Sequence, residues 1–506
     1  MMTNSNSQFE PASSEGMSSR SSPFPGDAID ALIPSPRRRW LALAILLTGN
    51  FVTILDLFIV NVAIPSIQGN LAASFAEVQL VLVGYAAAYG VFLMNGARLG
   101  DLFGRRRVFL TGMGLFTAAS GLCGIAWSPG WLIAARVLQG TGAAILMPQV
   151  LASIRVLFEG DQRRHAFGVM GAVQGVAATI SQLAGGMLIE HGGGEGWRLI
   201  FLINLPIGLI AMAAGSVVLI ETKAPVAARL DLRGALTGAL GLLLVLVPVM
   251  EGREYGWPWW AFAIPLLSIP VFWNFVRYEN GLWARGGVPI IEMSLFENPR
   301  FVAGVGAVFL FYSAISSFFL SLTVLLQFGL GLTPLVAGMI FTPSAVAFFV
   351  GSLAGPRLAA RSGSGALLAG ILIFACGPGL SALVAATAVD NLRLMILSLI
   401  LNGLGQGIVI PLAFNTILSG IRDDQAGMGA GVLSTMQTIG TSVGVTIVGV
   451  LLFSLIEHAT TASSLLTHQV YGHALAIATI YNVVAAILSF VLFTVAIYVR
   501  PNSRVV

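Results

Sequence analysis

Long apolar segments recur along almost the whole chain and are separated by short polar connections. The first, at about 40–64, would form a helix of about 36 Å, which is long enough to cross the hydrocarbon core of a bilayer. Each segment can satisfy its backbone hydrogen bonds internally as a helix, and none alternates as the strands of a membrane barrel do. We therefore expect an all-α polytopic membrane protein with 14 spans. The segments are 40–64, 78–97, 108–127, 131–154, 166–189, 199–220, 234–250, 259–277, 302–326, 334–356, 364–388, 393–418, 426–454 and 473–498.

The composition fits a lipid environment. Only 9% of the 506 residues are charged and 56% are hydrophobic, whereas roughly 25% of the residues of a soluble protein are charged. Residues 1–39 are the exception, because they are rich in Ser, Pro, Asn and Gly and end in Arg37-Arg38-Arg39. We expect them to form a disordered cytoplasmic tail. The apolar segment that follows is too long for the core of a cleaved signal peptide, so it is expected to remain as the first span.

Basic residues are distributed unevenly over the connections. If the N-terminus is cytoplasmic, the inner connections hold most of them, and the outer connections hold little beyond Arg198, Arg253 and Arg393. Arginine and lysine favour the cytoplasmic side of a membrane. We therefore expect a protein of the inner or plasma membrane with both termini in the cytoplasm. Because the basic residues form no single patch, the net charge of +4 does not predict a nucleic-acid partner.

Three short motifs of the first half of the chain recur in the same order in the second half. Residues 96–99 (Gly-Ala-Arg-Leu) match 355–358 (Gly-Pro-Arg-Leu), 139–142 match 402–405, and 168–170 match 431–433, at offsets of 259, 263 and 263. Nearly constant offsets predict two six-helix halves, at 40–220 and 301–500. Two extra spans would lie in the linker 221–300, and 501–506 would form a C-terminal tail. Parallel repeats of this kind place a substrate site between the halves, near mid-bilayer.

Four segments resemble signatures of one transporter family. Residues 96–107 (GARLGDLFGRRR) resemble the loop between helices 2 and 3 of the major facilitator superfamily. Residues 55–65 (LDLFIVNVAIP) resemble the first-helix signature of its fourteen-helix drug:proton antiporter branch, and 136–142 (RVLQGTG) the fourth-helix motif of drug antiporters. Residues 197–208 are similar to the entry of the sixth helix in that branch. The likeness runs from about 40 to 500.

This resemblance implies the major facilitator fold and secondary active transport by alternating access. It implies proton-coupled antiport that exports small amphipathic compounds such as drugs, antibiotics or metabolites. A proton-coupled carrier of one metabolite or nutrient with the same fold is the alternative. The chain departs from the family pattern at Leu102, where a second basic residue is usual, and at Ser181-Gln182, where Gly-Pro is usual. The second departure removes the proline kink associated with antiport.

Asp56 and Arg136 are the two charged residues well inside the apolar segments. A charge within the hydrocarbon costs roughly 2.5–3.5 kcal/mol on insertion scales, so such a residue is a candidate for function. Asp56 would lie about 12 Å and Arg136 about 7.5 Å from the outer ends of their helices. We expect the two side chains to meet, directly or through water, and to couple transport to protons. A purely structural ion pair is the alternative.

The loop at 96–107 is the second candidate site. Asp101 can pair with a nearby arginine or with a neighbouring helix end, and such a pair would hold one conformation of the halves until it breaks. The arginines could instead merely anchor the loop on the cytoplasmic side. The predicted gating residues are Gly96, Arg98, Gly100, Asp101, Gly104, Arg105 and Arg106. Four further glycines are expected to permit close helix packing: Gly140, Gly142, Gly185 and Gly186.

A third set of residues could line the substrate cavity. Its members are aromatic or amide side chains within the apolar segments, and packing in the core or against lipid is the alternative for each of them. The candidates are Asn50, Phe58, Asn61, Tyr85, Tyr89, Gln139, Gln174, Tyr312, Asn402, Gln406 and Gln437.

Other functions lack the motifs that they require. The single lysine, Lys223, belongs to no phosphate-binding loop, and the five histidines show no His-Glu-x-x-His spacing. Cys123 and Cys376 lie far apart in apolar segments and form no metal or redox motif. We therefore expect no enzymatic activity, no cofactor and no metal. The expected partners are a small-molecule substrate, protons and the lipid bilayer, and the chain is expected to act as a monomer.

Overall fold

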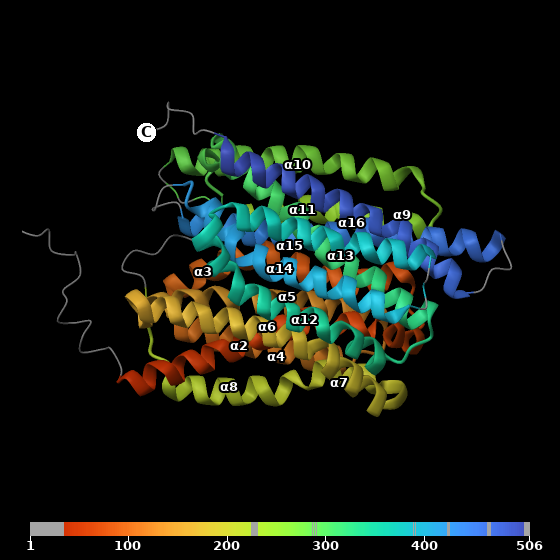
Figure 1. The fold of residues 1–506 in the computed structure, drawn as a ribbon. Helices are drawn as coiled ribbons and strands as arrows, with labels where there is room; N and C mark the ends of the chain where they lie inside the picture. Colours follow the sequence, from red (N-terminus) through yellow and green to blue (C-terminus); the bar gives the residue numbers. More distant parts are fainter. Residues whose placement is uncertain are drawn as a thin grey trace, which may run out of the picture.

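The computed structural model describes residues 35–223, 231–285, 287, 289, 291–387, 389, 391–421, 426–462 and 467–499. Most of the expected tail 1–39 and all of 501–506 lie outside these residues. Within them the chain is helical throughout (Figure 1). The helices are α2 (Pro36–Leu71), α3 (Phe75–Phe103), α4 (Arg105–Gly124), α5 (Pro129–Leu157), α6 (Gly160–His191), α7 (Gly196–Leu202), α8 (Asn204–Val218), α9 (Leu232–Glu254), α10 (Trp259–Ala284), α11 (Pro299–Val324), α12 (Pro334–Ser362), α13 (Gly365–Thr387), α14 (Leu392–Leu418), α15 (Ala426–Ala462) and α16 (Thr467–Tyr498).

Twelve helical segments of the described residues are long and apolar enough to cross a membrane, with α7 and α8 forming one of them. The all-α polytopic membrane fold is therefore confirmed. Helices α4 and α9 are not among the twelve, because α4 opens with three arginines and the apolar part of α9, Leu232–Val245, is short. The expected number of fourteen spans stays a prediction.

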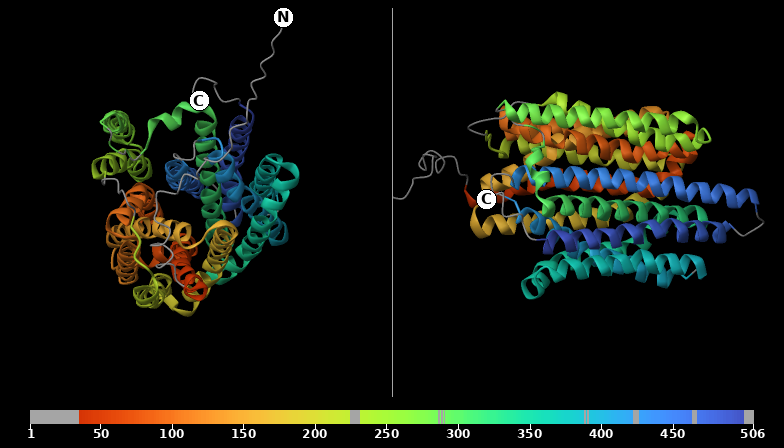
Figure 2. Two further views of the ribbon diagram at one scale, coloured as in Figure 1. Left: turned by 90° about the vertical axis from the view of Figure 1, so that its left-hand side faces the viewer. Right: turned by 90° about the horizontal axis from the view of Figure 1, so that it is seen from above.

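The helices form two groups with the same internal packing. In the first group α3 packs on α5, α4 on α5, and α2 on α6; in the second, α12 packs on α14, α13 on α14, and α11 on α15. We call α2–α8 the first half and α11–α16 the second half. Figure 2 shows the two groups side by side when the bundle is seen along its helices. The halves meet mainly where α6 packs on α12 and α3 on α15.

Helices α9 and α10 lie outside the two halves, at the upper left of the left-hand view in Figure 2. They pack on each other, and α9 also contacts α3 and α15. Most of α10 is exposed, since only Ala261, Ser268 and Glu279 are buried along it. An apolar helix with so little burial is suited to contact with lipid.

The helix ends follow from local sequence. Ser74 and Glu77 form a capping box at the start of α3. Ser128 caps α5 and Thr333 caps α12, and proline follows each of them in the first turn. Gly104 separates α3 from α4 with a φ of +101°, a conformation that side chains with a Cβ rarely adopt.

The four packing glycines lie where helices approach closely. A Cβ at Gly140 would collide with the backbone of Tyr85, and one at Gly142 with the backbone of Phe116. Gly185 lies against Ile59. A Cβ added to Gly186 would lie 2.6 Å from the Cα of Leu335 in the other half, which is too close for a real side chain. The first three contacts join helices within the first half, whereas Gly186 permits contact between the halves.

Candidate functional site

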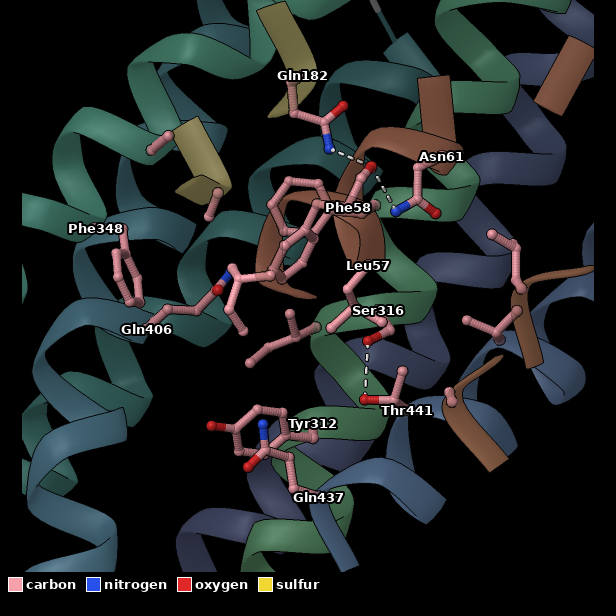
Figure 3. Close-up of a pocket in the computed structure, with 18 of the residues that line it drawn as sticks. Leu57, Phe58, Asn61, Gln182, Tyr312, Ser316, Phe348, Gln406, Gln437 and Thr441 are labelled. Carbon is pink, nitrogen blue, oxygen red and sulfur yellow. Dashed lines mark hydrogen bonds between the residues drawn. The ribbon is translucent and has the colours of Figure 1, made fainter. Parts of the chain in front are cut away.

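A cavity lies between the halves at about the middle of the bundle. Its empty volume is about 1320 Å³, open solvent at its mouth included. The first half contributes residues of α2, α3 and α6, and the second half contributes residues of α11, α12, α14 and α15 (Figure 3). The aromatic side chains of its wall are Phe58, Tyr312, Phe319, Phe341 and Phe348, and the polar ones are Asn61, Gln174, Gln182, Ser316, Ser344, Gln406, Gln437, Thr441 and Ser442.

Six of the eleven expected cavity residues line this space: Phe58, Asn61, Gln174, Tyr312, Gln406 and Gln437. The other five are not among the residues that line it, and for them the expectation stays a prediction. Asn50 donates to the sulfur of Met147, Tyr85 donates to the carbonyl oxygen of Thr53, and Tyr89 stacks on Tyr85. Gln139 binds Asp56, and Asn402 accepts from Gln406. Residue type alone did not reveal which face of each helix turns toward the other half.

The expectations also missed part of the wall. Gln182 replaces the usual proline of the fifth-helix motif, and its amide donates to the carbonyl oxygen of Phe58 at 3.3 Å. Ser316 and Thr441 bind each other at 3.2 Å across the cavity wall. The signal that could have found Gln182 was the departure from the motif itself, because a polar residue there must find partners within the bundle.

Asp56 and Arg136 are in direct contact within the first half. One Nη of Arg136 forms an ion pair with Oδ2 of Asp56, and the two side chains are 1% and 0% exposed. Nε of Arg136 donates to the carbonyl oxygen of Val81 at 3.2 Å, and the guanidinium lies 4.3 Å above the ring of Tyr85. The charge of the arginine is thus balanced by a carboxylate, a carbonyl and an aromatic face.

Amide and hydroxyl groups complete the surroundings of the carboxylate. Oδ1 of Asp56 accepts from Gln139 at 2.8 Å and from Asn204 at 3.1 Å. Both amides also donate to Oγ of Ser120, at 3.1 and 3.0 Å. The network joins α2, α4, α5 and α8 around the carboxylate of Asp56. Sequence reasoning placed Gln139 in the cavity and did not single out Ser120 or Asn204.

The ion pair lies outside the cavity wall, because α2 turns Leu57, Phe58 and Asn61 toward the cavity and Asp56 away from it. It is nevertheless connected to the contact between the halves. Val81, which accepts from Arg136, lies two residues after Gln79 on α3. Gln79 donates to the carbonyl oxygen of Val445 on α15 at 3.0 Å. The hydrogen bond from Arg136 and the hydrogen bond to the second half thus lie within one turn of each other on α3.

The family model that describes the Major Facilitator Superfamily matches residues 46–445. The chain belongs to this superfamily. A probable actinorhodin transporter of Streptomyces coelicolor is 38% identical over 444 residues, which are 87% of this chain and 77% of the relative. A puromycin resistance protein of Streptomyces alboniger is 34% identical, with 91% and 92% covered. A tetracenomycin C resistance and export protein of Streptomyces glaucescens is 30% identical, with 82% and 76% covered.

Solved structures of other transporters share the fold of this major facilitator protein. A bacterial homologue of the human lysosomal transporter Spinster, in an inward-facing and unoccupied conformation, superposes with a TM-score of 0.64 at 16% identity, over 91% of this chain and 98% of that one. An autoinhibited peptide transporter of the POT family gives a TM-score of 0.66 at 15% identity, over 93% and 99%. The protein is therefore a multi-pass membrane transporter and not an enzyme.

The loop at 96–107 of this transporter is held by the first half and by the linker. Asp101 pairs with Arg105 one turn further along, at 3.2 Å. The carboxylate of Glu221 accepts from the backbone N–H groups of Arg106 and Arg107, at 3.2 and 3.3 Å, and so caps the N-terminus of α4. Sequence reasoning missed Glu221, because it lies 115 residues from the loop that it binds.

The remaining loop residues differ in their surroundings. Arg98 donates to the carbonyl oxygen of Pro289 in the linker, and Arg106 to that of Ser216 at the end of α8. A Cβ at Gly96 would collide with the backbone of Ala144, and one at Gly100 with the side chain of Gln149. The expected gating residues thus lie where α3 and α4 meet α5, α8 and the linker.

The two ends of the bundle differ in how the halves of this transporter meet. We call the end at which α2 begins and α16 ends the basic end, because the arginine runs 37–39 and 105–107 lie there, and the opposite end the far end. Between the middle and the far end, Gln327 donates to Val62, and Thr333 to Glu190, each at 3.0 Å. Toward the basic end, an added Cβ at Gly168 or Gly171 of α6 would meet no atom of the described residues within 4 Å. The halves are therefore closed over the cavity at the far end.

Proposed function

We propose that this transporter exports small amphipathic compounds in exchange for protons. The observation that carries the proposal is the buried ion pair of Asp56 and Arg136, which lies beside the substrate cavity but outside its wall. Ionisable groups buried in membrane helices are functional candidates because burial of charge is costly. The names of the relatives, which include antibiotic export and resistance proteins, support export over uptake.

The distribution of arginine predicts which end of the bundle lies on the cytoplasmic side. With the basic end in the cytoplasm, the present conformation faces inward, since the halves are in contact at the far end. A substrate then enters the cavity from the cytoplasm or the inner leaflet. A cysteine placed at Gln469 should react with an impermeant thiol reagent from outside intact cells, and one placed at Arg107 should not; the reverse pattern would overturn the orientation.

A proton acts through Asp56. When the carboxylate is protonated, its ion pair with Arg136 weakens, and the guanidinium keeps only its neutral partners on α3 and α5. Because α3 also holds α15 through Gln79, this change alters the contact between the halves at the far end. The substrate-loaded transporter with unprotonated Asp56 opens at the far end, where the substrate leaves and a proton from outside binds Asp56. Protonation then favours the return to the inward-facing state, which delivers the proton to the cytoplasm.

The test is transport into everted vesicles that contain the full chain. A panel of ethidium, puromycin and chloramphenicol should include compounds that accumulate when the vesicle interior is acidified, and accumulation should collapse when a protonophore is added. Coupled uptake of a nutrient by intact cells, with no export of any panel member, would favour the carrier of a single metabolite. The protein is expected to act as a monomer in the plasma membrane, and reconstitution at one chain per liposome tests this.

Asp56→Asn tests the proton site itself, because the amide keeps the shape of the carboxylate and cannot titrate. We expect this variant to insert normally, to lose accumulation against a gradient, and to retain ligand binding. The direct measurement is proton release on addition of substrate to purified protein in detergent. Unchanged release in Asp56→Asn would remove Asp56 from the coupling mechanism and leave it a structural partner of Arg136.

A further inference from the structure

The cavity wall is mainly apolar with interspersed polar side chains, and it carries no ionisable acid or base among its described residues other than the phenol of Tyr312. Both halves contribute amide groups, with Asn61, Gln174 and Gln182 from the first and Gln406 and Gln437 from the second. The buried charges of Asp56 and Arg136 are bound to each other and do not belong to the cavity wall. A charged ligand would therefore lose its hydration without gaining a counter-charge from this wall.

Several polar side chains of the wall are free to bind a ligand. Within the described residues, no hydrogen bond is formed by the side chains of Gln174, Tyr312 and Gln437, although each is partly shielded from solvent. Tyr312 and Gln437 lie next to each other in Figure 3, on α11 and α15. An amide offers both donors and an acceptor, and a phenol offers one of each. The three groups can thus bind hydroxyl, carbonyl or amide groups of a ligand from both sides of the cavity.

The apolar part of the wall includes a group of aromatic side chains. Phe58 meets Phe319 edge to face with centroids 6.5 Å apart, and Phe319 meets Phe341 at 5.4 Å. These rings bring aromatic surface to the cavity wall, and aromatic rings of a ligand can pack against it by stacking or edge to face. Cation–π contacts alone replace only part of the hydration that an organic cation loses.

We infer that the cavity takes uncharged molecules with an aromatic body and several hydrogen-bonding groups, and that their exchange for protons moves net charge across the membrane. The inference rests on the proposed exchange for protons. When an uncharged substrate leaves and one proton enters, one positive charge enters the cell in each cycle. The membrane potential then drives export together with the pH difference, whereas one-for-one exchange of a monovalent cation for a proton would be driven by the pH difference alone.

The first experiment measures binding to the purified full chain. Three uncharged probes, chloramphenicol, 1,8-dihydroxyanthraquinone and 7-hydroxycoumarin at pH 6, are compared with three cations, ethidium, tetraphenylphosphonium and rhodamine 6G. At least one uncharged probe should bind, and the cations should bind at least about tenfold more weakly than it does. Equal or tighter binding of the cations, or no binding of the uncharged probes, overturns the inferred substrate class.

The second experiment measures the charge moved. Proteoliposomes without a pH difference receive a potassium diffusion potential, interior positive, through valinomycin. The uncharged probe that binds should accumulate in the vesicles whose basic end faces outward, by about tenfold for each roughly 59 mV. Accumulation that follows only an imposed pH difference would overturn the inference while keeping proton-coupled export. Absence of accumulation under either gradient would contradict the exporter proposal itself.

A single substitution should change the selectivity. Gln437→Glu keeps the size of the side chain and places a carboxylate in the wall, so ethidium should bind about tenfold more tightly or better because the cation gains a counter-charge. Gln469→Glu makes the same chemical change at an exposed position of α16 and serves as the matched control. Ethidium affinity that is equal in the two variants would show that ligands do not lie beside Gln437, and would overturn the assignment of this wall.

Discussion

The two halves share one helix packing but differ in what their cores contain. In the first half, Arg136 on α5 is paired with Asp56, and Gln139 and Asn204 bind the same carboxylate. In the second half, the residue at the repeat offset from Arg136 is Leu399, which is fully buried. Asn482 on its last helix donates to Ser317 on its first helix at 2.9 Å, much as Asn204 does to Asp56. The same architecture thus tolerates either an ion pair or neutral groups at its centre.

This difference indicates that helices can pack into such a half without a buried ion pair. Neutral side chains fill the corresponding space of the second half, where Ser381 and Ser398 bind each other and Asn402 binds Gln406. Replacing a buried ion pair by well-packed neutral residues is often neutral or stabilising. The pair in the first half is therefore retained for a reason other than stability, which supports its role in coupling.

The largest expected effect comes from replacing Arg136 by leucine, the residue type that the second half has at the equivalent position. Arg136→Leu should lower the free energy of unfolding by about 3–5 kcal/mol, because it leaves the carboxylate of Asp56 buried without its counter-charge. Thermal unfolding in detergent measures the loss.

The double variant Asp56→Ser with Arg136→Leu copies the neutral arrangement in full. It should regain most of the stability that Arg136→Leu loses and still fail to accumulate substrate against a gradient. A double variant that is as unstable as the single one would show that the two halves are not interchangeable in this way.

The opposite substitution, Ser317→Asp, places an acid in the second half, where Leu399 offers no counter-charge. We expect a loss of about 1–3 kcal/mol, as for a buried polar group without adequate partners, and a smaller loss at low pH, where the acid is neutral. Ser317→Asn, which keeps the size without the charge, is the control. Equal stability of Ser317→Asp at pH 5 and pH 8 would contradict the explanation.

A smaller difference is expected between Gln139→Leu and Asn402→Leu, two residues at the repeat offset. Gln139 donates to a charged group, so its loss should cost about 1.5–3 kcal/mol. Asn402 accepts from the neutral amide of Gln406, and its Nδ2 has no hydrogen-bond partner among the described residues, so Asn402→Leu should cost only about 0.5–1.5 kcal/mol. Thermal unfolding measures the stability of both variants. Equal losses of stability would mean that lost packing, and not the lost hydrogen bond to the carboxylate, accounts for the change.

The smallest effect is expected at the contact between the halves. Gln79→Leu removes the hydrogen bond to Val445 and should weaken closure of the far end by about 1 kcal/mol, or roughly fivefold in population. The rate at which a cysteine at Gln327 reacts with a thiol reagent from the far end reports this population. Asn50→Leu, which removes a hydrogen bond to Met147 within the first half, should leave the rate unchanged.

The sequence predicted the fold well, because apolar length and internal repetition are properties of the chain itself. It also predicted that Asp56 and Arg136 meet, since charges are rare in these segments and their depths agree. It did not predict the cavity wall equally well. Tyr85 and Tyr89 are aromatic like Tyr312, but they pack within the first half, and nothing in their residue type distinguishes the two situations. Ser120, Asn204 and Glu221 were missed because their partners lie far away in the sequence.

The ion pair faces away from the cavity, and this separation has a consequence for how such a transporter can evolve. Under the proposed function, the side chains that recognise the cargo and the side chains that supply the driving force are different ones. A substitution at Gln174, Tyr312 or Gln437 can then change which compound is carried while the bonds around Asp56 stay intact. A lineage that is exposed to a new toxic compound then needs to change only residues of the cavity wall, while the residues that couple transport to protons stay the same.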